Sequence, residues 1–552
     1  MSTNSEPTAP SRRRRRTAHA KSGCRTCKIR RVKCDEVRPS CAKCVTTGRV
    51  CDGYGIWEQP PATISLAQKP AGAPQQTLSL NYPLPLLPGL AHEEKRYLDR
   101  FQHLVISKLS QPFGSHFWSS IVTQLSMTEP AVVHGCIALA SAYESFIPKD
   151  GLESVASTVP PGAFMLRQYN RAIRALTTEL SSGNPVSLRT AVVSCVLFIC
   201  LEILRGDLNA MQAHFSSGIK LLRQLQNGDR KVALMDSAVL VKHNAEVLDD
   251  HLVDVFTRLN LHFLMLGHGS QLKQTFIPSF LYGRRIQIPR QFYSTREVRQ
   301  SLTILLLSII HLIKEAEQLT LDTDIHPPPP SAVMIEKQKA LQSALSEWTA
   351  AYELSEGRLS TSASTQEKLG LLMLRMYADI FSAFLGTCFS IKETSYDTHT
   401  AVFESTIKRY EEVFSIQEST TLNSEFKSNP VFTIDMGFFP PLYSTALKCR
   451  NPKIRREALS LLRRFRHMEG PWTGDKVARV AEYVMRLEEA HFEGQSDVVL
   501  PEFCRIHCVE CKLPDQHSPG ANMGSLTMRR FRHELGKEGG WVVMKCEIDL
   551  GA

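Results

Sequence analysis

The chain has 552 residues, 43% of them hydrophobic and 22% charged, which is enough for more than one domain and is typical of a soluble globular protein. Its longest apolar run, 191–204, is interrupted by Glu202, so we expect no membrane-spanning segment and no membrane partner. No apolar stretch follows the basic N-terminus as it would in a signal peptide. Residues 1–51 hold 14 Lys/Arg against 3 Asp/Glu, whereas the rest hold 51 against 52, so the net charge of +10 arises at one end and predicts a polyanion-binding head on a neutral body.

The first segment, residues 1–20, contains Ser, Thr, Pro and Arg and lacks hydrophobic periodicity, so we expect a disordered basic leader. It includes an unbroken run of arginines. Such a run is typical of a nuclear localisation signal or of an arm that contacts phosphates, and neither role needs a folded structure. We therefore predict localisation in the nucleus through Arg12, Arg13, Arg14, Arg15 and Arg16.

Regularly spaced cysteines follow within residues 24–51. A Cys-x2-Cys-x6-Cys pattern occurs twice, with a loop between the two copies. An even number of cysteines is compatible with a disulfide knot, but a chain without a secretory signal favours reduced thiolates. Each Cys-x2-Cys pair forms a tight loop that lets two sulfurs reach one tetrahedral Zn²⁺. We predict a metal site with the ligands Cys24, Cys27, Cys34, Cys41, Cys44 and Cys51.

The number of sulfurs sets the stoichiometry that we expect. Six thiolates are two short of two separate tetrahedra, but two thiolates that bridge both ions would satisfy two Zn²⁺. Neighbouring Lys and Arg side chains would offset the resulting negative charge. A segment of this size has no hydrophobic core of its own, so metal ligation has to supply the free energy of its folding.

The array resembles the binuclear zinc cluster of fungal transcription factors, and all of its cysteine positions match that pattern. The resemblance implies that Cys24 and Cys41 bridge the two ions. It further implies that two pairs complete one site each, namely Cys27 with Cys34 and Cys44 with Cys51. We therefore expect a binuclear zinc-cluster DNA-binding domain over residues 21–52.

The segment between the second and third cysteines, "KIRRVK", is mostly basic and is interrupted by Ile29 and Val32. We expect a short helix that turns its basic side chains outward and packs its aliphatic residues on the metal core. Arg and Lys read guanine O6 and N7 in the major groove, and the resemblance implies that Arg30 and Arg31 contact the bases of a CGG-type triplet. Phosphate contacts, which position a protein without specifying sequence, are predicted for Arg25, Lys28, Lys33 and Lys43.

Two other interpretations of these charges are open. The basic residues could only keep an exposed metal loop in solution, which is the usual role of a charged run. Zinc knuckles also bind single-stranded RNA, but they usually stack bases on aromatic residues, and residues 24–51 contain no Phe, Tyr or Trp. Tyr54 and Trp57 lie just beyond the cluster.

Residues 53–91 are rich in Pro, Gln and Ala and lack periodicity, so we expect a flexible linker. Many zinc-cluster factors have a coiled coil near this place, but no apolar heptads extend over three repeats here. The spacing of half-sites therefore does not follow from the sequence. The chain would bind as a monomer or as a homodimer that pairs through its large domain.

From residue 92 onward, apolar residues recur at helical spacing, for example in "EEKRYLDRFQHLVISKL", and we expect a large all-α domain over residues 92–552. Strand propensity is concentrated near the C-terminus, where "SLTMRRFRH" and "GWVVMKCEI" predict a small β-hairpin. The fold class that we expect is mostly α. Besides the helices up to residue 225, helices are predicted near residues 246–266, 297–320, 332–354, 366–390, 399–416, 439–448, 452–467 and 474–491.

The body also resembles the fungal-specific transcription factor domain that accompanies zinc clusters. The segments that carry the resemblance are "GDLNAMQAHFSSGIKLL", "FTRLNLHFLMLG" and "KCRNPKIRREALSLLRRFRHMEGPW". The resemblance implies a regulatory domain that binds a small-molecule effector, restrains the activator or assembles a coregulator. The sequence has no nucleophile elbow, zinc-protease motif, P-loop or dinucleotide-binding motif, so we expect no enzymatic activity.

A second group of cysteines lies near the C-terminus in "CRIHCVECKLPDQH". One pair in this stretch has the spacing of a zinc knuckle, but the other candidate ligands are crowded against it instead of standing at a loop's distance. A further metal site and a set of reduced thiols in a loop are both open for Cys504, His507, Cys508 and Cys511.

Together, these features predict a nuclear, sequence-specific DNA-binding transcription factor of RNA polymerase II genes. Its zinc-cluster helix would read CGG-like triplets in double-stranded DNA, and its helical body would regulate or recruit. One alternative is a DNA-binding adaptor or repressor without an activation function of its own. Another is a ligand-binding helical protein with a vestigial DNA-binding head. No acidic, aromatic-rich segment decides between activator and repressor.

Overall fold

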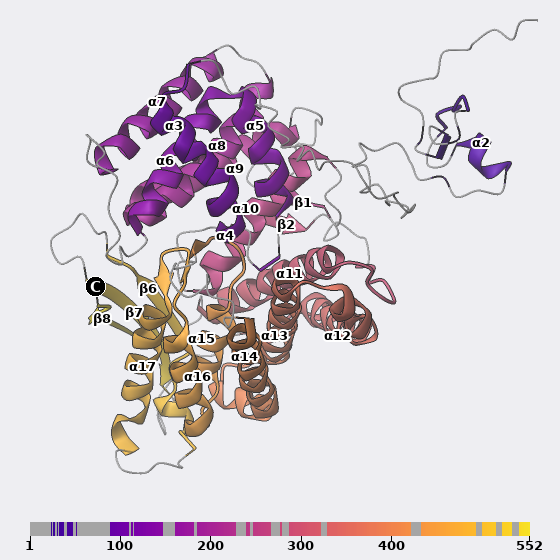
Figure 1. The fold of residues 1–552 in the computed structure, drawn as a ribbon. Helices are drawn as coiled ribbons and strands as arrows, with labels where there is room; N and C mark the ends of the chain where they lie inside the picture. The colour runs from indigo at the N-terminus through magenta and orange to yellow at the C-terminus, as the bar shows by residue number, and fades with distance from the viewer. Residues whose placement is uncertain are drawn as a thin grey trace, which may run out of the picture. The chain divides into compact units, whose positions relative to one another are not determined.

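The computed structural model of the chain divides into two units, Met1–Tyr82 and Pro83–Ala552 (Figure 1). In the first unit the structure describes residues 24, 26–27, 30, 32–37, 41–47 and 51. In the second it describes residues 89–551 except 110–111, 114, 147–160, 182–184, 228–238, 243–246, 267–275, 279–285, 322–327, 421–431, 493–498, 515–521 and 533–539. The predicted leader with Arg12–Arg16 and nearly all of the predicted linker lie outside the described residues.

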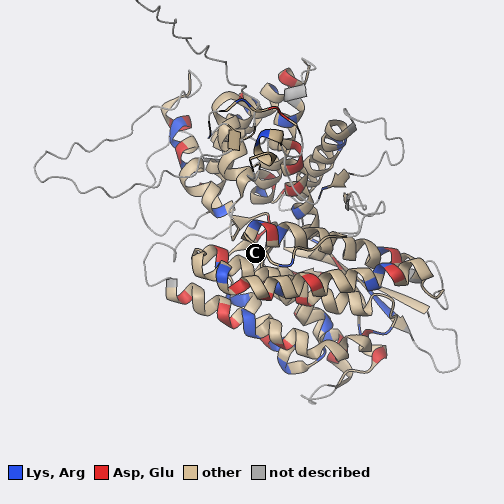
Figure 2. Ribbon diagram, turned by 90° about the vertical axis from the view of Figure 1, so that its right-hand side faces the viewer, with Lys and Arg blue, Asp and Glu red and all other residues tan. Residues whose placement is uncertain are grey.

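The second unit is built mainly of helices, as its apolar periodicity predicted (Figure 1). Acidic and basic residues are interspersed along these helices, in keeping with a body of balanced charge (Figure 2). The longer helices are α3 (His92–Arg100), α6 (Pro130–Phe146), α7 (Pro161–Ser181), α8 (Pro185–Arg205), α9 (Leu208–Asn227), α10 (Leu248–Met265), α11 (Thr295–Leu321), α12 (Ala332–Ser362), α13 (Thr365–Thr387), α14 (Thr400–Thr420), α15 (Phe439–Lys448), α16 (Pro452–Arg464) and α17 (Gly474–Glu489). Shorter helical elements are α4 (Ile106–Leu109), α5 (Thr123–Thr128), and the turns η1 (Phe101–Val105), η2 (Phe117–Val122), η4 (Glu393–His399), η5 (Ala490–Phe492) and η6 (Glu502–Cys504).

The first predicted helix of the body is interrupted by a wider turn. Residues 92–109 form α3, the π-helical turn η1 and then α4, so the hydrogen-bond ladder loses its regular period in the middle. The predicted apolar stripe is nevertheless on the inner side. Leu98, Phe101, Val105 and Leu109 are buried, and Leu104 packs half-buried against them.

Helices α8 and α9 form a hairpin around the Arg-Gly-Asp turn at residues 205–207. Gly206 has a φ angle of +74°, a conformation that residues with a side chain rarely adopt, so it ends α8 without strain. Asp207 then accepts a hydrogen bond of 2.9 Å from the backbone N–H of Ala210 and caps α9. On α9, a Cβ atom at Gly218 would lie 2.3 Å from the ring of Phe256, so glycine is what lets α9 and α10 approach each other.

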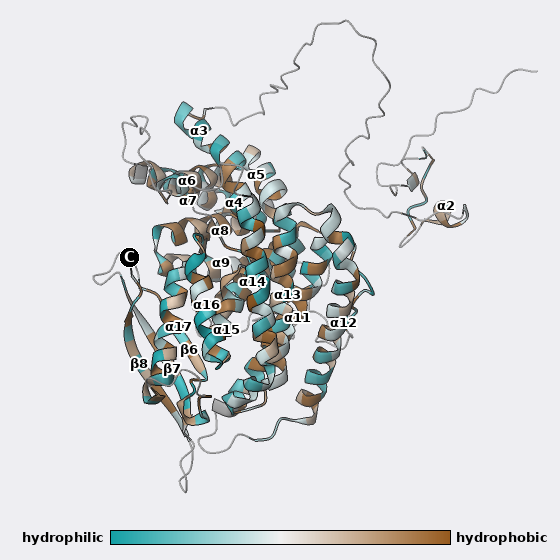
Figure 3. Ribbon diagram, turned by 60° about the horizontal axis from the view of Figure 1, so that its bottom comes forward, coloured by the Kyte–Doolittle hydropathy of each residue, from teal (hydrophilic) through white to brown (hydrophobic). Residues whose placement is uncertain are grey.

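The long helices α11 to α14 pack side by side below the N-terminal helices α3 to α10. Their apolar faces, brown in Figure 3, are turned toward one another. Trp348 on α12 is completely buried, and its indole N–H donates to Ser301 Oγ of α11 at 3.0 Å. Within the described residues, α13 is long and apolar enough to cross a membrane, which the sequence analysis did not expect. Because 72% of its most apolar window is buried inside the protein, it is a core helix.

A small antiparallel sheet closes the C-terminal part. Strands β7 (Met523–Arg532) and β8 (Gly540–Asp549) form the predicted hairpin, with Met523 opposite Asp549. The structure adds a third strand, β6 (Cys508–Lys512), antiparallel to β7. Smaller strands form two further pairings, one between β1 (Val239–Val241) and β2 (Phe276–Pro278), the other in the order β3 (Phe432–Thr433), β4 (Met468–Glu469) and β5 (Trp472–Thr473).

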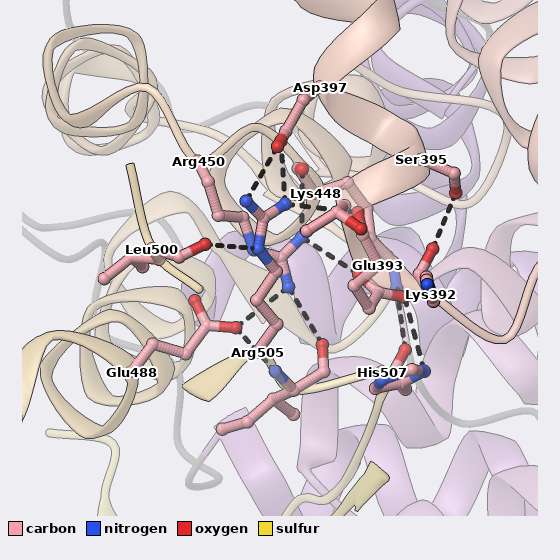
Figure 4. A network of polar contacts seen from close by, with 12 residues as sticks. Lys392, Glu393, Ser395, Asp397, Lys448, Arg450, Glu488, Leu500, Arg505 and His507 are labelled. Atoms are coloured by element: carbon pink, nitrogen blue, oxygen red, sulfur yellow. Dashed lines mark hydrogen bonds and ion pairs between the residues drawn. The ribbon is translucent and has the colours of Figure 1, made fainter. Parts of the chain in front are cut away.

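A buried network of ion pairs fastens the segment before β6 to the helices (Figure 4). The guanidinium of Arg505 is fully buried and donates to both carboxylate oxygens of Asp397 in η4, at 2.7 and 2.8 Å. Glu488 of α17 accepts from Arg450 at 2.9 Å and from Arg455 at 2.6 Å. Because each buried charge has a counter-charge, removing one partner would leave the other charge buried and uncompensated.

The same network predicts a pH-dependent contribution to stability from Glu502. Its carboxylate accepts from the backbone N–H groups of Glu393 (2.9 Å) and Thr394 (2.8 Å) and lies 3.3 Å from His507 Nε2. Although burial alone would raise it, these contacts lower the pKa of Glu502 from 4.5 to about 2. A lowered pKa in the folded state contributes stability that is present above pH 4.5 and is lost as the pH falls toward 2.

We expect Glu502→Gln to reduce the free energy of unfolding by about 1.5–3 kcal/mol near neutral pH, because hydrogen bonds to a charged acceptor are weakened. The difference from the wild type should shrink as the pH is lowered through the acid range, as followed by urea unfolding. Glu404→Gln removes the same charge from an exposed ion pair with Lys408 and should change stability by less than about 0.5 kcal/mol. A deficit in Glu502→Gln that does not change with pH would contradict the assignment.

Candidate metal centre and nucleic-acid interface

The cysteines of the first unit bring their sulfur atoms together in two groups of four. One group consists of Cys24, Cys27, Cys34 and Cys41, and the other of Cys24, Cys41, Cys44 and Cys51. Within each group the sulfurs all lie within 4.8 Å of one another, and Cys41 Sγ lies 3.6 Å from both Cys24 Sγ and Cys27 Sγ. Cys24 and Cys41 belong to both groups.

The two halves of the cluster share the same local geometry. The backbone N–H of Cys24 donates to Cys34 Sγ at 3.4 Å, and the backbone N–H of Cys41 donates to Cys51 Sγ at 3.5 Å. Each bond connects the first and third cysteine of one Cys-x2-Cys-x6-Cys copy. The repeat in the sequence is therefore a repeat in structure, and it places the first cysteine of each copy at the centre of the cluster.

Asp35 holds the second half of the cluster against the first. Its two carboxylate oxygens accept from the backbone N–H groups of Ala42 (3.2 Å) and Lys43 (3.1 Å), at the start of the short helix α2 (Ala42–Val45). This helix follows Cys41 and contains Cys44, so the contact sets the position of two of the sulfurs. The sequence analysis missed Asp35, although an acidic residue directly after the third cysteine of a basic segment was a visible anomaly.

The electrostatics of the sulfurs favour a bound cation. Burial raises the pKa of Cys24 and Cys27, and it raises the pKa of Cys41 to about 12. Without a cation these thiols would stay protonated near neutral pH, and crowded thiolates would repel one another. A divalent metal ion reverses both effects, because it stabilises the thiolate form directly. An all-sulfur set of tetrahedral size fits Zn²⁺.

The described residues place three of the predicted DNA contacts. Lys33 and Lys43 are exposed. Arg30 is half-buried, and its Nη1 donates to Thr47 Oγ1 in the other half of the cluster at 3.1 Å. Arg25, Lys28 and Arg31 lie outside the described residues.

The predicted packing of the basic segment is partly wrong. Thr26 and Cys27 are helical, and the backbone N–H of Arg30 donates to Thr26 O at 3.1 Å, whereas Val32 and Lys33 are not helical. Val32, expected against the metal core, is 38% exposed. The physical reason is that the cluster has no apolar core to cover, since its centre consists of the cysteines themselves.

The second cysteine group does not converge on a common point. Cys508 and Cys511 are three residues apart on strand β6, so their side chains lie on opposite faces. His507 is engaged by Glu502 and packs edge-on against Trp541 at 5.2 Å between ring centroids. Within the part of the chain that the structure describes, only the cysteines of the first unit form groups of metal-ligand size.

Comparison with known proteins defines the class. Residues 22–59 match the model of the fungal Zn(2)-Cys(6) binuclear cluster domain, and residues 96–264 match that of the fungal specific transcription factor domain. The remainder of the body is covered by neither match, so the boundaries that we assigned to the regulatory domain stay a prediction. No solved structure matches the chain.

Several named relatives are regulators of the same kind. The chain is 22% identical to the aspercryptin biosynthesis cluster-specific transcription regulator atnN of Emericella nidulans, over 85% of this chain and 87% of that protein. It is 28% identical to the transcription regulator lscL of Purpureocillium lilacinum over 42% of this chain and 55% of that protein. It is 29% identical to the Zn(2)-C6 fungal-type transcription factor afumD of Aspergillus fumigatus over 42% of this chain and 58% of that protein.

The chain carries a fungal Zn(2)-Cys(6) binuclear cluster domain and a fungal specific transcription factor domain, and its named relatives are fungal transcription regulators. It is a zinc-binding and DNA-binding regulator, and this family is one of regulators, not of enzymes. Proteins of this family typically act in the nucleus.

Asp35 provides a test of how the cluster is held together. We expect Asp35→Asn to weaken zinc binding by about tenfold, because its amide nitrogen cannot accept from the N–H groups that begin α2. Competition with a chromogenic chelator measures the affinity. Glu36→Gln removes the same charge from the neighbouring exposed residue and should leave the affinity unchanged. An equal loss in both variants would mean that only net charge matters at this position.

Proposed function

We propose that the chain is a nuclear, sequence-specific transcription factor of RNA polymerase II genes that reads CGG-like triplets through a cluster of two zinc ions. The observation that carries this proposal is the pair of four-sulfur groups that share Cys24 and Cys41. A single ion would use four of the cysteines and leave the others without a role. Two ions with two bridging thiolates use all of them.

In this proposal the six cysteines are the zinc ligands, in the roles that the resemblance assigns. Cys24 and Cys41 bridge the ions, since each lies in both sulfur groups. One ion is completed by Cys27 and Cys34, and the other by Cys44 and Cys51. The ions supply folding free energy and fix the backbone around the basic residues, while the protein orients the ligands through N–H···S bonds and Asp35.

The stoichiometry gives a direct test. We expect about two zinc ions per purified chain by elemental analysis. Cys41→Ser should lose both ions because both groups contain this residue, whereas Cys51→Ser should retain more zinc. Cys546→Ser, a cysteine of the body on β8, is the matched control and should keep the full content. One ion per wild-type chain, or equal losses in Cys41→Ser and Cys51→Ser, would contradict the shared-ligand arrangement.

The basic residues divide into two proposed roles. Arg30 and Arg31 contact the bases of the triplet, and the exposed Lys33 and Lys43 contact phosphates, together with Arg25 and Lys28. The hydrogen bond from Arg30 to Thr47 supports a fixed orientation of this guanidinium, because a preorganised side chain loses less entropy on binding. Base-reading and phosphate-binding residues differ in what their removal does to sequence preference.

Selection of bound sequences from random duplex DNA with the full chain tests these roles. We expect an enriched CGG-like triplet that disappears when zinc is chelated. Arg30→Ala and Arg31→Ala should each reduce discrimination between bases by about 1–3 kcal/mol, whereas Lys28→Ala should weaken binding to all sequences similarly.

Thr47→Val is the matched control for Arg30, because it removes the hydrogen-bond partner and keeps the arginine. If Thr47→Val loses preference as Arg30→Ala does, the bond orients the reader; if Arg30→Ala and Arg31→Ala both keep the wild-type motif, these residues are not the readers.

The same selection addresses assembly. Paired triplets at constant spacing would support a homodimer that pairs through the helical body, and single triplets would support a monomer. Nuclear entry through Arg12–Arg16 is the localisation that we propose. Because one relative is named a biosynthesis cluster-specific regulator, genes close to that of this chain are the first place to look for selected sites.

A further inference from the structure

The helical body contains a cavity of about 220 Å³ between α10, the start of α11 and the segment 113–117. It lies where the N-terminal helices (α3 to α10) meet the bundle of α11 to α14. In Figure 1, α10 lies between the N-terminal helices and the bundle of α11 to α14 below them. One turn after another of α10 faces the cavity with His251, Asp254 and Arg258, and the first turns of α11 face it with Arg296 and Arg299. The aromatic residues Phe113 and Phe117 close it from the side.

Arg258 in this cavity is satisfied by carboxylates. Its Nε lies 2.8 and 2.9 Å from the two oxygens of Asp435, and its Nη1 contacts Asp254 on the preceding turn of α10. Although burial alone would raise it, Arg258 and Arg299 hold the pKa of Asp254 below its ordinary value, so the Asp254 carboxylate is ionised near neutral pH. This ion pair connects α10 to the segment before α15 and has a structural role.

Arg299 is not satisfied in the same way. It is only 7% exposed, and within the part of the chain that the structure describes, its Nε and Nη1 have no hydrogen-bond partner. The nearest carboxylate oxygen, Asp435 Oδ2, lies 3.9 Å from Nη1 and is already held by Arg258. The guanidinium rests over the ring of Phe113 at 5.1 Å. Burial and the neighbouring Arg258 lower the pKa of Arg299 to about 10, so the side chain is still charged in the cell.

The other groups around the cavity leave it positively charged. The three guanidinium groups of Arg258, Arg296 and Arg299 face two carboxylates, Asp254 and Asp435. His251 is neutral near pH 7, because burial together with Arg296 and His116 lowers its pKa to about 4. The cavity also adjoins the N-terminal turn of α11, where backbone N–H groups favour an anion.

A buried charge without a partner is costly, and proteins usually pair it or use it. The cavity borders the Arg299 side chain, so an anionic group bound there would supply a second counter-charge. Its volume is below the range of about 300–1,000 Å³ that drug-sized ligands fill, which limits the ligand to a small metabolite.

We propose that this cavity is the binding site for a small anionic metabolite, whose carboxylate or phosphate group is bound by Arg299 with Arg296 and the N-terminus of α11. The ligand would contact both helix groups and stabilise their packing. This proposal names a binding site in the body and does not depend on how the zinc cluster reads DNA. The other interpretation is that Arg299 has only a structural role.

Thermal unfolding of the full-length chain distinguishes an anion-binding site from a structural role of Arg299. The probes are inorganic phosphate and succinate, and chloride at equal ionic strength is the reference. We expect saturable stabilisation by at least one probe, and none by succinamide, the uncharged counterpart of succinate. In Arg299→Met the apparent affinity for that probe should fall at least about tenfold. The variant's unfolding temperature without ligand should not fall, because an apolar chain of similar length replaces an unsatisfied charge.

Arg174→Met removes the same charge from an exposed position on α7 and should respond to the probe as the wild type does. The proposal is overturned if neither probe gives saturable stabilisation, or if Arg299→Met and Arg174→Met respond alike. It is also overturned if Arg299→Met unfolds at a lower temperature and retains the wild-type affinity, since Arg299 would then be structural. Should Arg299→Met fail to fold, Arg299→Gln replaces it with the same criteria. Zinc content and DNA selection test the proposed function separately, so failure here leaves the proposed function standing.

Discussion

The zinc–thiolate interaction is the constraint on which the DNA-binding unit depends. Its cysteine sulfurs are mostly buried against one another, and burial alone would keep them protonated. Only a cation makes a compact set of thiolates favourable. Because the cysteines form the centre, no apolar residues are needed there, and Val32, Val37 and Val45 are exposed beside Lys33 and Lys43. The same interaction therefore explains how so small a unit is stable without an apolar core.

The body depends on different forces. Its helices bury an extensive apolar core, and its buried charges are arranged in networks such as that of Arg505, Asp397 and Glu488 (Figure 4). Such networks add specificity to packing, because a displaced helix would leave a charge without its partner. The contrast between satisfied arginines and Arg299 is what distinguishes a structural ion pair from a candidate ligand site. The two units thus use positive charge in opposite ways, one exposed to a polyanion and one enclosed.

Two properties of the protein, its cysteine cluster and its helical body, could be predicted from the sequence because they depend on residues close together in the chain. The cysteine spacing determines which sulfurs can reach one metal ion, since short loops have few conformations. The apolar period of the body likewise predicted its helices and the β7–β8 hairpin, because period and turn residues are read over neighbouring positions. The outlines of the cluster and of the helical body follow from these patterns alone.

Features that depend on residues far apart in the sequence were decided only by the tertiary structure. Strand β6 is too short to stand out, and it forms only because β7 offers an edge. Arg258 meets Asp435 across 177 residues and Arg505 meets Asp397 across 108, distances over which no local pattern extends. The contact of Asp35 with the start of α2 and the missing hydrogen bonds of Arg299 Nε and Nη1 also depend on the fold. The sequence by itself therefore determined the chemistry and the class of the protein, and the fold decided which buried charges have hydrogen-bonded partners and which do not.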